Sequence, residues 1–208
     1  EGCEIMAASV TVDADDRVYC FNRNKEHPVV VFDRDGNFLS SWGAGLFAFP
    51  HTIRLSRDGK NLWIVDRDHA QMMLFDLSGR LLRTLGTKGF RSDTGVAADD
   101  FRSDAYRSVT HGGGPFNLPT DIDVAPSGEM FVTDGYGNAR VHKFSADGTH
   151  LLSWGEPGTG PGEFNLPHAV WIDRRGRLLV ADRENDRIQV FTREGKFVRT
   201  WGKKGAGE

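Results

Sequence analysis

The sequence has few cysteines, no long hydrophobic run and no excess of charge of one sign. Two cysteines in 208 residues are too few for a disulfide framework, and no apolar stretch approaches the length of a membrane-spanning helix. Lysine and arginine together (26) nearly balance aspartate and glutamate (29), with both signs interspersed. The charge pattern therefore gives no indication of a nucleic-acid or a membrane partner.

Cys20 lies in an apolar run, and free cysteines are commonly buried. We therefore expect Cys20 to be a small core residue rather than a metal ligand, and its pairing with Cys3 stays open. The sequence begins with Glu1 rather than methionine and shows no signal peptide at its start. Both a cytoplasmic and a secreted location consequently stay open.

Glycine, by contrast, is abundant (25 residues) and regularly placed. One pattern occurs four times, at 7–24, 49–68, 117–136 and 166–185, and each copy is followed by two glycines seven residues apart. These pairs are Gly36 and Gly43, Gly79 and Gly86, Gly148 and Gly155, and Gly195 and Gly202. The first glycines of successive pairs lie 43, 69 and 47 residues apart. One unit is therefore about 45 residues long, a length typical of propeller blades, and an insertion falls at 87–115.

Each unit is predicted to contain four short β-strands, and no stretch shows helical spacing with caps over three turns. In the fourth unit the expected strands are 169–172, 178–181, 187–192 and 197–201. The fold class is therefore all-β. Since one four-stranded sheet cannot bury both of its faces, we expect the sheets to stack radially in a single β-propeller domain. Its units are about 7–43, 49–86, 117–155 and 166–202.

Two units deviate from the repeat by carrying a histidine at the same position. His51 and His168 each follow a proline at the entrance to the innermost strand, where the third unit has Thr120. Both imidazoles can point at the axis around which the sheets stack. Imidazoles that converge from separate units suit zinc, and a catalytic zinc site typically has three protein ligands and one open position. The alternative is that each histidine forms hydrogen bonds within its own blade entrance.

The repeats resemble NHL repeats, and among NHL proteins they are most similar to the peptidyl-α-hydroxyglycine α-amidating lyase family. The resemblance covers nearly the whole chain. Its most specific stretches are Phe49-Pro50-His51, Pro119-Thr120-Asp121, DGYGNAR at 134–140, FNLPH at 164–168 and ADRENDRIQVF at 181–191.

The resemblance implies a six-bladed propeller with a zinc ion held by three histidines from different blades. His51 and His168 match two of these ligands, and the third would lie beyond Glu208, so we expect a chain truncated at its C-terminal end. A structural calcium ion is also known in the family, but the resemblance leaves it open here because one ligand would lie next to the third histidine.

The resemblance also implies roles for three further residues. Tyr136 matches the catalytic tyrosine that acts as general base on the substrate hydroxyl, and a neighbouring cation would help it to accept that proton. Arg23 and Arg183 match two functional arginines, which suit a substrate carboxylate. Alternatively, Tyr136 only stacks in its turn. Because Arg67 occupies the equivalent position in the second unit, an arginine here also fits a structural bridge to Asp66 or Asp182.

Two departures from the family pattern stand out. Animal lyases have a cysteine pair where this chain has Asn117 and Gly137, so nothing here supports an oxidising compartment. The insertion at 87–115 is longer than a plain blade connection and is predicted to be a lid. His111 within it is expected to be a solvated loop residue.

Two hypotheses follow. In the first, the chain is part of a zinc-dependent carbon–nitrogen lyase that cleaves a carbinolamide, carried by a small-molecule or peptide substrate with a carboxylate, to an amide and glyoxylate. In the second, it is a non-catalytic NHL propeller whose loops bind a partner protein or a small ligand. Fold alone does not separate the two.

Overall fold

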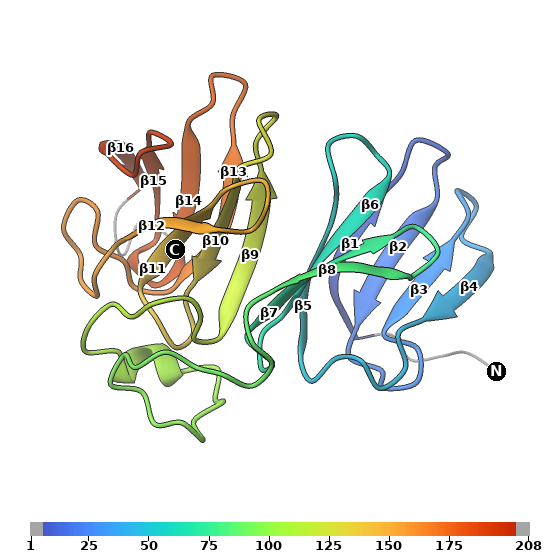
Figure 1. Cartoon of the computed structure of the whole chain (residues 1–208), viewed down its shortest axis with the longest axis horizontal. Coiled ribbons are helices and arrows are strands. Elements are labelled where there is room, and N and C mark those ends of the chain that lie inside the picture. Colours follow the sequence, from blue (N-terminus) through green and yellow to red (C-terminus); the bar gives the residue numbers. More distant parts are fainter. Residues whose placement is uncertain (1–5, 203–208) are drawn as a thin grey trace. The chain divides into compact units, whose positions relative to one another are not determined.

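The computed structural model describes residues 6–202 and consists mainly of β-strands (Figure 1). Within these residues, sixteen strands form four four-stranded antiparallel sheets, and the strands of each sheet neighbour one another in chain order. The all-β fold class and the four strands of each repeat are thereby confirmed. The chain divides into two compact units, Glu1–Lys88 and Gly89–Glu208.

The first compact unit contains two sheets. The first sheet consists of β1 (Ala7–Val12), β2 (Val18–Asn22), β3 (Val29–Phe32) and β4 (Phe38–Trp42). The second consists of β5 (Pro50–Leu55), β6 (Asn61–Asp66), β7 (Gln71–Asp76) and β8 (Leu81–Leu85). The first strands, β1 and β5, face each other. Between the two sheets lies a core that includes Phe21, Ile53, Ile64 and Phe75.

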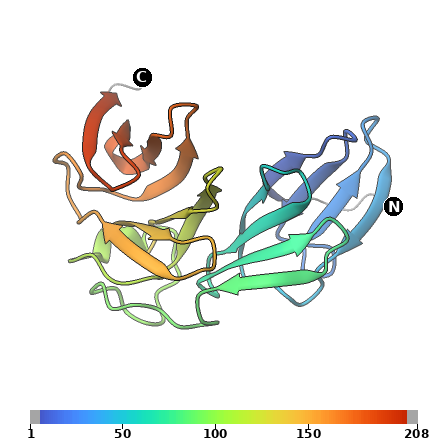
Figure 2. The ribbon, with the colours of Figure 1, turned by 45° about the horizontal axis from the view of Figure 1, so that its top comes forward.

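The second compact unit also contains two sheets, and Figure 2 shows the strands of each sheet side by side. The third sheet consists of β9 (Pro119–Val124), β10 (Met130–Asp134), β11 (Arg140–Phe144) and β12 (His150–Trp154). The fourth consists of β13 (Pro167–Ile172), β14 (Leu178–Asp182), β15 (Arg187–Phe191) and β16 (Phe197–Gly202). β9 packs against β13. Two short 3₁₀ turns are η1 (Ala105–Ser108), in the insertion, and η2 (Arg183–Asn185).

The repeat glycines adopt the conformation for which glycine is needed. All eight have φ between +76° and +106°, a region that residues with a Cβ rarely adopt. At Gly155 close packing adds a second requirement, because a Cβ would lie 2.5 Å from both the Ala139 carbonyl oxygen and the Phe164 ring. The glycine register therefore marks the turns between the third and fourth strands and the ends of the fourth strands.

Cys20 lies in β2 and is 8% exposed, which confirms it as a core residue, and burial raises the pKa of its thiol. Cys3 lies outside the described residues, as does the C-terminal end at which the chain is expected to be truncated. Within residues 6–202 no helix has both the length and the apolar character needed to cross a membrane.

Candidate functional site

In three of the four sheets, a buried aspartate at the end of the second strand is hydrogen-bonded to the segment that leads into the first strand. Each of these carboxylates is fully buried and accepts a hydrogen bond from a backbone N–H just before the proline of the first strand. The bonds join Ala48 to Asp66 (2.8 Å), Asn117 to Asp134 (2.8 Å) and Asn165 to Asp182 (2.7 Å). These bonds fix the segments that carry the predicted site residues.

The predicted histidines and arginines occupy equivalent places in the repeat. His51 and His168 are the second residues of β5 and β13, and both are half-buried. Arg23, Arg67 and Arg183 directly follow β2, β6 and β14. The register predicted for both sets of residues is confirmed.

Three predicted site residues of the second compact unit meet around one phenol oxygen. The Tyr136 hydroxyl lies 3.2 Å from Nε2 of His168, and Nη1 of Arg183 donates to the same oxygen at 3.2 Å. The Tyr136 and His168 rings are T-shaped at 5.6 Å, and the guanidinium of Arg183 lies 5.5 Å from the centre of the Tyr136 ring. His168 thus contacts a tyrosine of the preceding repeat rather than only its own blade entrance.

The electrostatic environment keeps His168 neutral. Burial, with a smaller contribution from the positive charge of Arg183, lowers the pKa of His168 to about 4. A neutral imidazole can accept a hydrogen bond from Tyr136 or offer its lone pair to a metal ion. The Tyr136 oxygen therefore has a fixed cation on one side and a neutral acceptor on the other, an arrangement suited to proton transfer.

Arg183 is oriented by two residues that the sequence did not single out. Its Nε donates to Glu184 Oε1 at 2.9 Å, and the Tyr106 hydroxyl donates to Glu184 Oε2 at 3.0 Å. The alternative of a structural bridge to Asp182 is met by Arg187, whose Nε donates to Asp182 at 2.7 Å, whereas Arg183 pairs with Glu184. Glu184 directly follows Arg183 in the sequence, but nothing there indicated that Tyr106, 78 residues earlier, would reach it.

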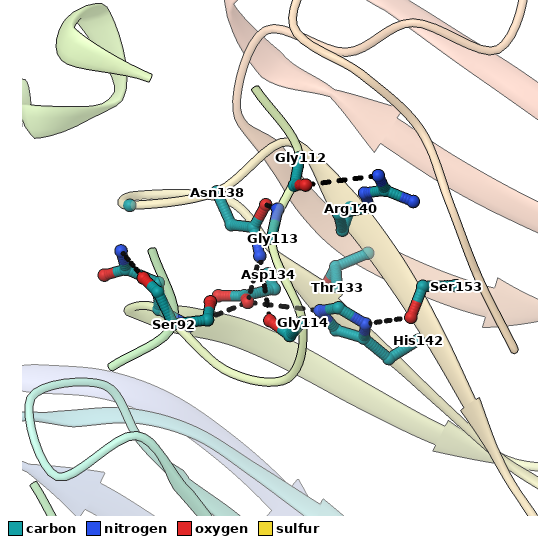
Figure 3. A network of polar contacts seen from close by, with 12 residues as sticks. Ser92, Gly112, Gly113, Gly114, Thr133, Asp134, Asn138, Arg140, His142 and Ser153 are labelled. Atoms are coloured by element: carbon teal, nitrogen blue, oxygen red, sulfur yellow. Dashed lines mark hydrogen bonds and ion pairs between the residues drawn. The ribbon is translucent and has the colours of Figure 1, made fainter. Parts of the chain in front are cut away.

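The insertion is anchored to the third repeat by hydrogen bonds of its three consecutive glycines with Asn138 and Arg140 (Figure 3). The N–H of Gly113 donates to Asn138 Oδ1 at 3.1 Å, and Asn138 Nδ2 donates to the Gly114 carbonyl at 3.3 Å. Nη2 of Arg140 donates to the Gly112 carbonyl at 3.2 Å. His111 is exposed, as predicted. The insertion is thus a fixed wall of the second compact unit.

The residues beneath Tyr136 have an unusual backbone conformation. Leu118 and Leu166, which precede the prolines of β9 and β13, have φ of +58° and +64°, uncommon values for bulky side chains. Both are buried in a cluster with Tyr136 and Ala105 of the insertion. Such strained conformations cost on the order of 1–3 kcal/mol each and persist where packing holds them.

The other two predicted site residues belong to the first compact unit. The Arg23 guanidinium lies 4.2 Å from the centre of the Phe49 ring, and Arg67 lies 3.9 Å from that same centre. Arg67 is 3% exposed, and its Nε donates to Asp68 at 2.7 Å. Nδ1 of His51 lies 3.3 Å from Oγ1 of Thr52. Arg67 is thus built into the blade, whereas Arg23 is exposed at a cleft of about 170 Å³.

The candidate donors for a metal ion belong to different compact units, His51 to the first and His168 to the second. No group of three histidine, cysteine or acidic side chains gathers at metal-binding distance in residues 6–202. The chemistry of the single donor His168 nevertheless suits zinc, because zinc binds the neutral form of imidazole.

Comparisons with known proteins agree with the repeat pattern. A six-bladed β-propeller family matches residues 1–93, and the NHL repeat matches 116–144 and 164–191. The chain is 34% identical to mouse NHL repeat-containing protein 3 over 194 residues, covering 88% of the chain and 51% of that protein. It is 35% identical to peptidyl-alpha-hydroxyglycine alpha-amidating lyase 2 of Drosophila melanogaster over 170 residues, covering 79% of the chain and 36% of that protein.

A similar fold occurs in a solved structure of virginiamycin B lyase from Staphylococcus aureus, crystallised as an inactive H270A variant with quinupristin. The TM-score is 0.65 at 14% identity, with 97% of this chain and 57% of the lyase chain covered. This likeness concerns the fold alone. The chain spans about half of the mouse protein and about a third of the fly lyase.

Proposed function

We propose, from the premise that this chain is an NHL-repeat β-propeller protein, that it forms part of a carbon–nitrogen lyase of the peptidyl-α-hydroxyglycine amidating type. Its substrate would be a carbinolamide with a carboxylate, cleaved to an amide and glyoxylate. The observation that carries the proposal is the Tyr136 hydroxyl held between His168 and Arg183, each at 3.2 Å. Homologues named as amidating lyases support it.

In this reaction Tyr136 is the general base. Its oxygen takes the proton of the substrate hydroxyl while the bond from the hydroxyl-bearing carbon to the amide nitrogen breaks. The carbon–oxygen double bond of glyoxylate forms, and the departing nitrogen receives the proton. The N–H of Arg183 on the Tyr136 oxygen stabilises the negative charge that this base requires.

The substrate carboxylate is assigned to Arg23 and Arg183. The side chain of Arg183 is 41% exposed although it contacts both Tyr136 and Glu184, so part of its guanidinium can meet a ligand. Guanidinium groups bind carboxylates in a fixed orientation through paired hydrogen bonds. Arg183 would thus bring the substrate carboxylate close to the base.

The proposed metal is zinc, with His51 and His168 as two of its ligands. When bound, zinc supplies Lewis-acid polarisation of the substrate hydroxyl. The neutral state of His168 supports this assignment. A structural calcium ion stays a prediction.

The test measures metal content and turnover in the full-length parent protein. Stoichiometric zinc is expected; His168→Ala should remove it, and Tyr136→Phe should keep it while lowering turnover by at least about a hundredfold, the usual contribution of a general base. His111→Ala, an exposed histidine of the insertion, is the matched control. A parent protein that stays metal-free under zinc-replete conditions would contradict the proposal.

The second candidate is a non-catalytic NHL scaffold that binds a partner protein or a small ligand. The similarity to NHL repeat-containing protein 3, which is named for its repeats, agrees with this candidate. Full-length protein without zinc and without turnover on a peptidyl-α-hydroxyglycine would favour the scaffold over the lyase.

A further inference from the structure

An open cleft of about 750 Å³ lies in the second compact unit beside Arg183. The insertion forms one wall, through η1 and Val109. The other walls come from the segment that precedes β13 and from the segment that follows β14. The lining includes Tyr106, Arg107, Thr159, Phe164, Leu166 and Glu184. This volume falls within the range of ligand-binding clefts and exceeds what a small carbinolamide with its carboxylate requires.

The cleft is continuous with the proposed catalytic residues because Arg183 belongs to both. Its Nη1 donates to the Tyr136 hydroxyl, while its side chain also lines the cleft. Hydrogen bonds connect the residues along the wall: Arg107 donates to the Tyr106 hydroxyl at 3.1 Å, and Tyr106 and Arg183 both donate to Glu184, at 3.0 Å and 2.9 Å. A ligand in the cleft therefore lies against the residue that orients the base.

The lining suits an uncharged chain with polar and apolar parts. Two arginines, Arg107 and Arg183, are balanced by Glu184 and Asp186, so the formal charge of the lining is zero. The half-buried side chains of Tyr106, Val109 and Pro157 supply the apolar part of the surface. Backbone amides can pair with the polar groups while side chains cover the apolar ones, which is the chemistry of a peptide.

We propose that this cleft is the subsite for the peptidyl segment that precedes the reacting residue of the substrate. The inference rests on the proposed lyase function and extends it, because it locates the peptidyl segment in one cleft of this chain and so predicts tighter binding of peptides of at least three residues than of small amides. Thr159 is an exposed residue of the cleft wall. A larger side chain at this position should therefore occupy part of the subsite.

The experiment is an NMR titration of the full chain with two unreactive probes, acetyl-Ala-Ala-Gly and acetylglycine. Both end in a glycine carboxylate, and neither carries the α-hydroxyl. The tripeptide should shift the backbone amide signals of Val109, Ala139 and Thr159, whereas acetylglycine should leave them in place. A tripeptide that moves none of these signals at millimolar concentration overturns the proposal.

Thr159→Trp is the decisive variant, because an indole at this wall should weaken tripeptide binding by about tenfold and leave acetylglycine unaffected. Thr149→Trp, at an exposed threonine of the turn between β11 and β12, is the matched control. Unchanged tripeptide affinity in Thr159→Trp would refute the subsite. Failure of the lyase proposal is a separate outcome. In that case the full-length parent protein would lack zinc or turnover, while the tripeptide would still shift the amide signals of this chain.

Discussion

At the residue scale, His168 is half-buried and its surroundings favour the neutral imidazole. Its ring contacts Tyr136, and Arg183 adds positive charge nearby. Burial and this charge both oppose protonation, so the imidazole keeps a lone pair at neutral pH. Because burial and Arg183 both lower the pKa of His168, protonation of this residue should destabilise the folded protein.

Stability should therefore depend on His168 at acidic pH. Its pKa is about 4 in the folded protein, against an ordinary value of 6.5. Between these values the unfolded state binds the extra proton, so the free energy of unfolding should fall as the pH drops from about 6.5 to 4, with the full contribution present above 6.5. Urea denaturation of metal-free protein at pH 7, 5.5 and 4.5 measures this fall.

His168→Gln should flatten the pH dependence in that window. His111→Gln, at an exposed position, is the control and should reproduce the unsubstituted protein. An unchanged slope in His168→Gln would show that the histidine does not stay neutral in the fold.

At the element scale, the third and fourth sheets use different residues to hydrogen-bond the buried aspartate of their second strand. The buried aspartate that ends the second strand accepts a hydrogen bond from the third strand at 3.2 Å in both. The donor is Gln189 Nε2 to Asp182 in the fourth sheet and His142 Nε2 to Asp134 in the third (Figure 3). The other ring nitrogen of His142 lies 2.7 Å from the Ser153 hydroxyl. This Asp–His–Ser row therefore belongs to the framework of the blade.

Replacing His142 should test this equivalence. His142→Gln should keep a donor to Asp134 and change the free energy of unfolding by less than about 1 kcal/mol. His142→Leu should cost roughly 1–3 kcal/mol, because the buried carboxylate loses one of its donors. Equal stabilities of the two variants in urea denaturation would contradict a framework role for this hydrogen bond.

The insertion offers a matched pair of glycines. A Cβ on Gly112 would collide with the Arg140 guanidinium, whereas a Cβ on Gly114 has no heavy atom within 4 Å, and neither residue has a positive φ. Gly112→Ala should destabilise the protein by about 0.5–1.5 kcal/mol, because the Arg140 guanidinium must move and lose its hydrogen bond to the Gly112 carbonyl. Gly114→Ala should be neutral or slightly stabilising. Thermal unfolding of both variants measures the difference, and similar losses in both would mean that the Arg140 contact does not anchor the insertion.

At the scale of the whole molecule, each compact unit has its own core. The cluster around Phe21, Ile64 and Phe75 lies entirely in the first compact unit. The clusters around Phe131 and Val180 and around Leu118 and Tyr136 lie entirely in the second. Two face-to-face sheets bury the apolar side that a single sheet leaves exposed.

The second compact unit should therefore fold by itself. Residues 89–208 expressed alone are expected to give a cooperative urea transition and dispersed amide signals, with the Leu118 and Leu166 methyl groups shifted by the Tyr136 ring. A fragment without a cooperative transition would show that its two sheets depend on the first compact unit.

Much of the fold could be predicted from the sequence because a blade is a local pattern. The paired glycines mark turns that need a positive φ, and alternating apolar residues mark strands, so both features lie within a few neighbouring residues. The equivalent places of His51 and His168 follow from the same register. The site was predicted only in part, since Glu184 and Tyr106 orient Arg183 through contacts between segments far apart in the chain.

The sequence by itself determined the all-β class, the four strands of each unit and the repeat positions of Tyr136, His168 and Arg183. Only the tertiary structure decided that these three side chains meet at one phenol oxygen, that Arg183 pairs with Glu184 rather than Asp182, and that the insertion forms a cleft wall. The physical reason is that strands and turns depend on backbone geometry over a few residues. Hydrogen bonds between side chains depend instead on how sheets and insertion pack in space.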